Sequence, residues 1–409
     1  MGGQVLLLDG IKVVSFCHFL QGPAAAQYLA DMGADVIKVE PVAGAHERHW
    51  SGAKVFVEGV SGFYLCANRN KRSIGIDLKS EGGREIALRL IAEADVVMEN
   101  FRPGVFARLG FSEDEMRRVN PNVIFASASG FGSSGPMVGR PGQDILIQAA
   151  SGMISATGAP SRGATAVGAA VCDQHGGALM AVGILGALLK RERGGKPTRV
   201  ESSLLNSGID LQTEPLVNYF AGNLGRDRFD RDENLATWFH EAPYGVYPAR
   251  DGDMVISLCT DTALAEALSS DTLRGLVGHD RYEERDAFAA AVRDATHTMT
   301  LAELSARFDE HGVWYSPVQT YDDLADDPQI AHCEVFRDVE VRGRKVRLVN
   351  HPNRYDGQVP ELRFMALEIG EHTREIMTEI GYAGEEIDGM LARGAVVEPA
   401  GEALEKRVV

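Results

Sequence analysis

Short apolar runs alternate with helical patterns along the first half of the chain. The runs that are rich in β-branched residues occupy residues 11–16, 35–40, 73–78, 95–100 and 123–130. Between them lie stretches with apolar residues at helical spacing, such as PAAAQYLADMG and GGREIALRLIAEA. Strand, helix and strand repeated in this order are typical of a parallel sheet with helices on both faces. The pattern therefore predicts an α/β fold with a doubly wound parallel sheet.

The second half of the chain is more mixed. The segment 177–193, GALMAVGILGALLKRER, predicts a long apolar helix that ends before a Gly-Gly pair. The tail, IGEHTREIMTEIGYAGEEIDGMLARGAVV, predicts two short helices. We expect the large domain to begin with residues 1–206. A linker (207–235) and a small α/β domain (236–325) follow, and residues 326–409 return to complete the large domain.

Composition and charge narrow the class of protein. The net charge of −17 argues against a nucleic-acid partner, because phosphate backbones require a basic surface. A local group of Lys and Arg can still bind an anionic small molecule. The five cysteines are scattered and form no CxxC pair, so neither a disulfide framework nor a metal site is indicated. The opening residues lack the pattern of a signal peptide. We expect a cytoplasmic protein without membrane contact, tightly bound cofactor or metal.

Two features are typical of binding sites for phosphates. GFGSSG (130–135) fits the dinucleotide fingerprint, but Pro136 follows at once, where a helix would have to begin. We therefore expect a mobile loop there. Basic residues cluster in NRNKR (68–72) and at Lys79, Arg102 and Arg108, near predicted strand ends. They can form a solvated basic face or hold a polyphosphate ligand.

The stretch GAAVCDQHGG (168–177) carries three side chains that can attack an electrophile. Asp173 stands directly before an apolar helix, which is a preferred position for an N-cap. Cys172 lies among apolar residues, where a thiol is usually buried and inert. His175 falls in the first turn of the expected helix. The residues alone leave open whether Asp173 caps the helix or acts as a catalyst.

Several blocks, taken in order, resemble the class III coenzyme A-transferases, the group of formyl-CoA transferase, carnitine CoA-transferase and the bile-acid-inducible proteins. They are DGIKVVSFCHFLQGPAAAQYLADMGADVIKVEP, NRNKRSIGIDLKSEGG, ADVVMENFRPGVFARLGF, PNVIFASASGFGSSGP, PGQDILIQAASGMISATG, DDPQIA and IGEHTREIMTEIGY. Each block is weak by itself, but the ordered set is specific and runs from residue 9 to about 397.

This resemblance implies a site and an assembly. It implies that Asp173 is the covalent nucleophile. The CoA contacts that it implies are Lys79, Asn100, Phe101 and Arg108, and the substrate pocket that it implies includes Gln21, Gln143 and Asp144. It further implies a Rossmann-like large domain built from both ends of the chain, a smaller inserted domain, and two chains interlocked as a homodimer.

The implied reaction moves coenzyme A from an acyl-CoA donor to a carboxylate acceptor. A carboxylate attacks the thioester and forms an aspartyl anhydride. The released CoA thiolate then forms an aspartyl-CoA thioester, from which the acceptor takes the CoA through a second anhydride. A helix start also favours the ionised carboxylate, so capping and catalysis are compatible for Asp173.

Two other functions remain as alternatives. Relatives that racemise 2-methylacyl-CoA thioesters use a histidine where this chain has Gln143, and an amide cannot exchange a proton at a useful pKa. A CoA-binding protein without catalysis would use Asp173 only as a cap. Trp314 and Tyr315 are candidates either for shaping the acyl pocket or for packing in a core. The sequence favours the transferase.

Overall fold

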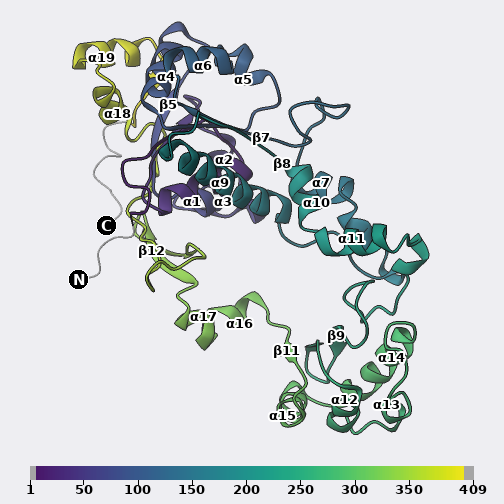
Figure 1. The fold of residues 1–409 in the computed structure, drawn as a ribbon. Coiled ribbons are helices and arrows are strands. Elements are labelled where there is room, and N and C mark those ends of the chain that lie inside the picture. The colour runs from purple at the N-terminus through teal and green to yellow at the C-terminus, as the bar shows by residue number, and fades with distance from the viewer. Residues whose placement is uncertain (1–5, 400–409) are drawn as a thin grey trace. The chain divides into compact units, whose positions relative to one another are not determined.

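The computed structural model of the chain describes residues 6–399, so the first five positions of the opening stretch and the last ten of the tail lie outside the described residues. The chain divides into two compact units (Figure 1). Unit 1 comprises the residues up to 147, residues 170–207 and those from 328 onward. Unit 2 comprises residues 148–169 and 208–327. Unit 2 thus includes a stretch assigned above to the large domain and nearly all of the predicted linker, in which a helix forms.

A seven-stranded sheet forms the centre of unit 1, in the order β14-β5-β2-β1-β6-β7-β8. All neighbours are parallel except β14, which runs antiparallel to β5. The strands are β1 (Lys12–Ser15), β2 (Asp35–Glu40), β5 (Lys71–Ile76), β6 (Val96–Glu99), β7 (Ile124–Ser129), β8 (Arg199–Ser203) and β14 (Val396–Val397). The predicted α/β class and its mostly parallel sheet are confirmed. Strand β8 was not predicted, because RVESS has a single apolar residue and so gives no apolar run.

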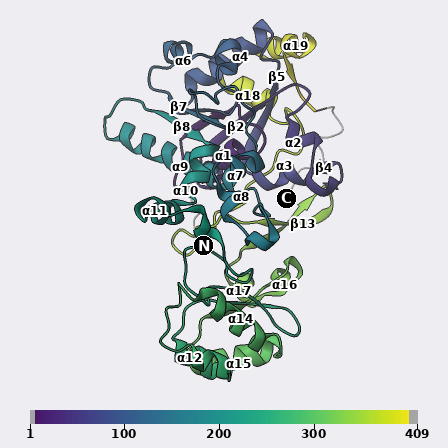
Figure 2. The same ribbon diagram turned by 90° about the vertical axis from the view of Figure 1, so that its right-hand side faces the viewer.

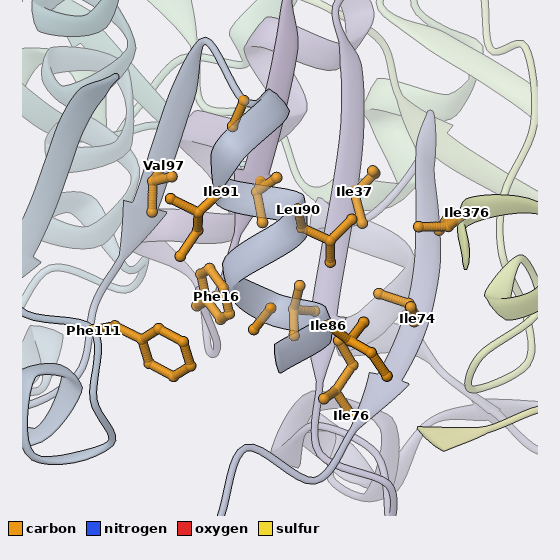
Figure 3. Close-up of a cluster of buried hydrophobic side chains, with 14 of the residues drawn as sticks. Phe16, Ile37, Ile74, Ile76, Ile86, Leu90, Ile91, Val97, Phe111 and Ile376 are labelled. Atoms are coloured by element: carbon orange, nitrogen blue, oxygen red, sulfur yellow. The ribbon is translucent and has the colours of Figure 1, made fainter. Parts of the chain in front are cut away.

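Helices cover both faces of this sheet (Figure 2). On one face, α1 (Gln21–Asp31) and α9 (Val171–Glu192) pack on small and branched side chains from β1, β2, β6 and β7. On the other face, α4 (Glu81–Glu93), α5 (Val105–Arg108) and α6 (Glu113–Val119) cover a core that includes Phe16, Ile86, Leu90 and Phe111 (Figure 3). Strands buried on both faces read as near-continuous apolar runs, which explains why their pattern was predictive.

The C-terminal residues complete unit 1. Helices α18 (Thr373–Glu379) and α19 (Gly384–Ala392) contribute Ile376, Met377, Ile387 and Met390 to the same core as Phe16. Strand β14 then pairs with β5 at what would otherwise be the edge of the sheet. The two short helices predicted from the tail are therefore confirmed, and both serve the N-terminal half of the chain.

Helix α9 is the long apolar helix predicted from the sequence, and it begins six residues earlier than 177. Its length and composition would suffice to cross a membrane, as those of a core helix of a soluble protein can. Met180 and Ile184 are fully buried in the core beneath the sheet. Leu179, Val182 and Leu189 lie on another side of the helix and are exposed. The helix is thus a core element with a second apolar stripe.

The remaining elements of unit 1 are short. Two hairpins, β3 with β4 and β12 with β13, pack around Tyr64 and Leu65. Their bounds and those of the short helices are β3 (Phe56–Val57), β4 (Val60–Ser61), β12 (Phe336–Val341), β13 (Arg344–Val349), α2 (His46–His49), α3 (Gly62–Ala67) and α17 (Pro328–His332). Helices α7 (Asp144–Ala150) and α10 (Leu204–Asp210) run from unit 1 into unit 2.

Unit 2 has its own antiparallel sheet, in the order β11-β10-β9, and its own core around Tyr247, Phe288 and Phe308. Tyr315 packs beside that core, with its ring 5.3 Å from that of Phe308, whereas Trp314 is 64% exposed. Core packing thus accounts for Tyr315 and not for Trp314. The elements are α8 (Met153–Ala156), α11 (Thr213–Ala221), β9 (Gly245–Pro248), β10 (Asp253–Ile256), α12 (Asp261–Ala267), α13 (Asp271–Gly275), α14 (Arg285–Thr296), α15 (Leu301–His311), β11 (Tyr315–Pro317) and α16 (Tyr321–Asp326).

Candidate active site

The start of α9 is capped by a side chain from α7. One carboxylate oxygen of Asp144 accepts the backbone N–H of Cys172 at 2.7 Å and that of Asp173 at 3.0 Å. The N-cap position itself is Ala170, which offers no side-chain acceptor, and Asp173 is the third residue of the helix. The interpretation of Asp173 as the N-cap is therefore wrong. The capping role belongs to Asp144, which leaves the carboxylate of Asp173 available for other chemistry.

Asp173 is half-buried, and the backbone N–H of Gln21 at the start of α1 lies close enough to act on its carboxylate. Burial, reinforced by the charge of Asp144, raises the pKa of Asp173 to about 7, and the backbone N–H of Gln21 opposes this rise. The expectation that the helix start keeps this carboxylate ionised is not met, because burial and a second carboxylate outweigh the helix end. Near neutral pH the group is present in both protonation states.

Two glycines bring α1 and α9 into close contact beside Asp173. A Cβ atom at Gly176 would lie 2.7 Å from Nε2 of Gln21, and one at Gly177 would lie 2.9 Å from the Gln21 carbonyl oxygen. Nε2 of Gln21 donates to Oγ of Ser202, 3.3 Å away. The Gly-Gly pair thus allows the approach that places Gln21, predicted as a pocket residue, against the carboxylate.

The other predicted residues near the start of α9 have different surroundings. Cys172 is fully buried, as expected, and burial raises its thiol pKa to about 12, which disfavours the reactive thiolate. His175 lies two positions beyond Asp173 and is half-buried. Gln143 is exposed directly before α7, and its carbonyl accepts the N–H of Ile147. Asp144 thus binds the backbone N–H of Asp173, Gln21 lies close to the carboxylate of Asp173, and Gln143 makes no hydrogen bond to Asp173 or Gln21 within the described residues.

A cavity of about 460 Å³ lies at the carboxyl ends of β1, β2 and β5, and we call it the β2 cavity. Lys79 and Phe101, both predicted CoA contacts, line it together. The side-chain amide of Asn100 binds the backbone of His18. Nδ2 donates to the His18 carbonyl oxygen at 2.7 Å, and Oδ1 accepts the His18 N–H at 2.9 Å. Arg108 is exposed at the end of α5, next to Leu109 of the lining. Two of the four predicted contacts, Lys79 and Phe101, thus line one cavity. Asn100 fixes the backbone of His18, which is another lining residue.

His18 is a lining residue that sequence reasoning missed. Its ring lies 5.2 Å from that of Phe101 and 5.0 Å from that of Phe19. Burial lowers the pKa of His18, which favours a neutral imidazole. The signal for it was its place directly after the first predicted strand, where ligands of parallel sheets bind.

Buried ion pairs form the floor behind the β2 cavity. Lys38 and Glu47 lie 2.6 Å apart with side chains at most 2% exposed. Glu40 accepts Arg48 at 2.7 Å through both carboxylate oxygens. These pairs join the end of β2 to helix α2, which carries His46 into the lining. Sequence reasoning missed them, because nothing local marks a charged residue of a strand as paired.

The NRNKR cluster is neither a ligand site nor a solvated face. Arg69 pairs with Asp31 at 2.7 Å, and Arg72 pairs with Asp35 at 2.6 Å, both with buried guanidinium groups. Lys71 donates to backbone carbonyls, including that of Pro23 at 2.7 Å, and is fully buried. Both interpretations of these three residues are therefore wrong. Arg69 and Arg72 are held in ion pairs to α1 and β2, and Lys71 is held by carbonyl oxygens.

The GFGSSG loop is confirmed as irregular backbone, since no helix begins between Gly130 and Asp144. Among residues 6–399, no group of three or more His, Cys, Asp or Glu side chains is placed to hold a metal ion. Unit 1 therefore holds a half-buried carboxylate at the start of α9 and, at the carboxyl ends of β1, β2 and β5, a cavity that carries one lysine. This set suits the capture of an activated carbonyl on an anionic carrier.

Comparisons with known proteins agree with this chemistry. Residues 8–373 match the family model described as CoA-transferase family III. The chain is 33% identical to an acetyl-CoA:oxalate CoA-transferase of Acetobacter aceti, with 85% of this chain and 89% of the relative covered. It is 30% identical to a succinate–glutarate CoA-transferase of Agrobacterium fabrum, with 91% and 95% covered.

A crystal structure of a CaiB/BaiF family protein from Brucella suis superposes with a TM-score of 0.78 at 30% identity, with 91% of this chain and 99% of that chain covered. The fold is therefore shared along nearly the whole chain. The chain belongs to CoA-transferase family III and is an acyl-CoA:carboxylate CoA-transferase.

Proposed function

We propose that Asp173 is the nucleophile through which this enzyme transfers coenzyme A. The observation that carries the proposal is the placement of its carboxylate, which is half-buried at the start of α9 and free of the capping role, because Asp144 fills that role. Such a carboxylate keeps its oxygens available for attack. Small neighbours at Ala169 and Ala170 leave room for a thioester carbonyl beside it.

The reaction then proceeds in four acyl-transfer steps through this one side chain. A carboxylate oxygen of Asp173 attacks the acyl-CoA carbonyl, which forms an aspartyl anhydride and releases the CoA thiolate. The thiolate attacks the aspartyl carbonyl, which releases the donor acid and leaves an aspartyl-CoA thioester. The acceptor carboxylate attacks this thioester, and the thiolate finally attacks the acyl carbonyl of the second anhydride. Each bond made replaces one of similar energy, and the raised pKa makes the carboxylate more basic when it is ionised.

The β2 cavity is the site that we assign to the nucleotide part of CoA. Lys79 supplies an exposed ammonium group for a phosphate, and Phe101 and His18 supply ring faces for a base. Arg108, which is exposed at the end of α5 next to the lining residue Leu109, is the second cation that we assign to the nucleotide, and Asn100 acts by fixing the backbone of His18. A Lys79→Ala variant is expected to raise the KM for acyl-CoA more than it lowers kcat, because binding and not chemistry is affected.

We also propose that two chains form the interlocked, cytoplasmic homodimer of the family. Helices α7 and α9 expose apolar residues that a monomer of this enzyme would leave in water: Ile145, Leu146, Leu179, Val182 and Leu189. Exposed apolar groups of this kind mark protein interfaces. A Val182→Asp variant is expected to elute at the monomer position in size-exclusion chromatography. If the Val182→Asp variant still elutes as a dimer, the exposed face of α9 does not contribute to the interface.

Trapping of the covalent intermediate tests the proposed nucleophile. The enzyme is incubated with acetyl-CoA, succinyl-CoA or a longer acyl-CoA, quenched with hydroxylamine and analysed by peptide mass spectrometry. A hydroxamate at Asp173 is expected for at least one thioester, and it is absent from Asp173→Ala. Asp271→Asn, which changes an exposed aspartate of unit 2, serves as the control and retains the label. A label on any other residue would refute the assignment.

A further inference from the structure

A second cavity, of about 510 Å³, lies between strands β7 and β8 and helices α5 and α6, beside the carboxyl end of β6. We call it the β7 cavity. All of its lining residues belong to unit 1, and its volume is that of a site for a small molecule. Phe101 lines both this cavity and the β2 cavity. The transfer described above uses neither the β7 cavity nor the buried carboxylate in its wall.

One face of the sheet supplies the polar wall of the β7 cavity. Strand register places Glu99, the last residue of β6, beside Ser127 of β7, which in turn lies beside Glu201 of β8. Two residues further along, Ser129 lies beside Ser203. Paired positions of neighbouring strands point to the same side of a sheet, and all five residues line the cavity. The polar wall therefore carries two carboxylates and three hydroxyl groups.

Glu99 is the buried acid of this wall, and it has no ion-pair partner within residues 6–399. The residue is 9% exposed, and the only hydrogen bond of its side chain in that range joins Oε2 to the N–H of Phe101 at 2.8 Å. Burial raises its pKa to about 7, and the Phe101 N–H and the charge of Arg199 oppose this rise. The nearby thiol of Cys17 stays neutral, because burial raises its pKa to about 12. A buried charge without a partner is costly, so a cation that reaches Oε1 stabilises ionised Glu99.

The other charged groups of the lining compensate one another. Arg199 contacts Glu201 at 2.7 Å and Glu113 at 3.2 Å. Glu113 also contacts Arg117, which lies outside the lining, at 2.9 Å. Two cations thus meet two carboxylates, and Glu99 is the acid of the lining that remains outside this set. With Glu99 ionised, the cavity therefore carries one uncompensated negative charge, which a single monocation neutralises.

Aromatic rings give the β7 cavity an apolar wall as well. The ring of Phe106 lies 5.8 Å from that of Phe101, 5.0 Å from that of Phe111 and 6.4 Å from that of Phe125, measured between centroids. The guanidinium carbon of Arg199 lies 5.6 Å from the centroid of Phe125, so a contact between a cation and a ring already belongs to this lining. Aromatic faces attract both hydrocarbon groups and cations. A ligand that suits this wall is an organic cation with an apolar body.

Two other classes of ligand fit this cavity poorly. An anion is repelled by ionised Glu99, and no basic residue of the lining is free of a carboxylate, since Arg199 is paired twice. A metal ion needs several ligands, and within residues 6–399 no group of three or more His, Cys, Asp or Glu side chains is placed to hold one.

We propose that the β7 cavity is a second binding site, separate from the transfer, for a primary ammonium ion with an apolar body. The ammonium group pairs with Glu99, and the body packs on Phe101 and Phe106. An ammonium group has three N–H donors. After the bond to Glu99, the hydroxyl oxygens of Ser127 and Ser129 in the same wall accept the remaining two.

Calorimetric titration of the full-length, CoA-free enzyme with phenethylamine tests the proposal. The probe is a cation at both pH 6 and pH 8, because the pKa of an aliphatic ammonium is about 10, whereas Glu99 changes from mostly protonated to mostly ionised. One-to-one binding is expected, with an affinity that rises about tenfold from pH 6 to pH 8, as linkage to the loss of one proton requires. In Glu99→Gln the side chain keeps an oxygen for the N–H of Phe101 but has no charge, so binding is expected to be lost. Glu93→Gln, which removes an exposed carboxylate from the same unit, retains binding and its pH dependence.

A second variant separates loss of the site from damage to the fold. Arg199→Gln removes the cation that shares the wall with Glu99, so phenethylamine is expected to bind about twofold to fivefold more tightly at pH 8. Damage to the fold does not produce such a gain. The proposal is overturned by no binding at pH 8, by equal affinity at the two pH values, by binding that survives in Glu99→Gln, or by weaker binding in Arg199→Gln. Equal binding of ethylamine or of phenylacetate also overturns it, because the aromatic wall or the charge of the ligand would then contribute nothing.

Discussion

Replacing Asp144 by asparagine separates two effects that this side chain has on Asp173. The carboxylate of Asp144 accepts two N–H groups at the start of α9, and its charge disfavours ionisation of the neighbouring carboxylate. Asparagine retains an oxygen that can accept both N–H groups but removes the charge. The helix start is preserved, and the pKa of Asp173 is expected to fall. The fall is partial, because burial is the larger cause of the shift and is unchanged.

The size of the effect depends on pH. With a pKa of about 7, about a tenth of Asp173 is ionised at pH 6, so the gain in reactive carboxylate at that pH is at most about tenfold. Well above pH 7 the carboxylate is ionised in both proteins. The acidic limb of kcat/KM, which reports the free enzyme, is therefore expected to move to lower pH in Asp144→Asn while the plateau stays within about twofold.

The assay is the initial rate at which the CoA thioester of a carboxylate acceptor forms from an acyl-CoA donor across pH 5 to 9. Asp144→Ala is the companion variant, because it removes the charge and also the cap, which costs about 1 kcal/mol of helix stability. It is expected to lower the rate at every pH, since the start of α9 and with it Asp173 lose their anchor. An acidic limb in Asp144→Asn that coincides with that of the wild type would refute the reasoning.

Two stability predictions concern the buried core. Glu47→Gln leaves Lys38 buried without its charged partner and is expected to lower the free energy of unfolding in urea by about 3–5 kcal/mol. Glu93→Gln, at the exposed Lys12 pair, is expected to lower it by less than about 1 kcal/mol, and similar losses in both variants would contradict the role of burial. Ile86→Ala removes a fully buried side chain of α4 and is expected to lower the free energy of unfolding by about 2–5 kcal/mol. The exposed Val277→Ala is expected to lower it by about 0.5 kcal/mol. Equal urea midpoints for the two variants would contradict the packing of α4 shown in Figure 3.

The sequence predicted those parts of the fold that have a hydrophobic pattern within a short stretch of chain. Five strands of the large sheet were visible because strands buried on both faces are continuous apolar runs. Strand β8 was not predicted because its residues, RVESS, are mostly polar, and four of them line a cavity. The two helices of the tail were predicted from the helical spacing of their apolar residues. The local sequence does not indicate that Ile376 and Met390 pack in the same core as Phe16, because that contact joins opposite ends of the chain.

The site was predicted as a set of residues but not as a geometry. The blocks of the family contain Asp173, Gln21 and Asp144, but the capping bond joins residues 28 positions apart, and only the folded chain shows which aspartate makes it. The same holds for Arg69, whose acid partner lies 38 positions away, so that a basic run typical of a phosphate site is a set of buried ion pairs. Glu99 was passed over because a carboxyl at a strand end has no sequence pattern of its own.

The pairing of β14 with β5 has a consequence for synthesis of the protein. Residues 373–397 leave the ribosome long after β5, and until they do the side of the sheet around Ile74 and Ile76 lacks helices α18 and α19 and its edge strand. Unit 2 lies entirely upstream of these residues and can fold first. The nascent chain therefore carries an exposed edge on β5 until β14 arrives, and such an edge is prone to strand-to-strand association. A chain that stops before residue 373 would keep this edge permanently uncovered and is expected to aggregate.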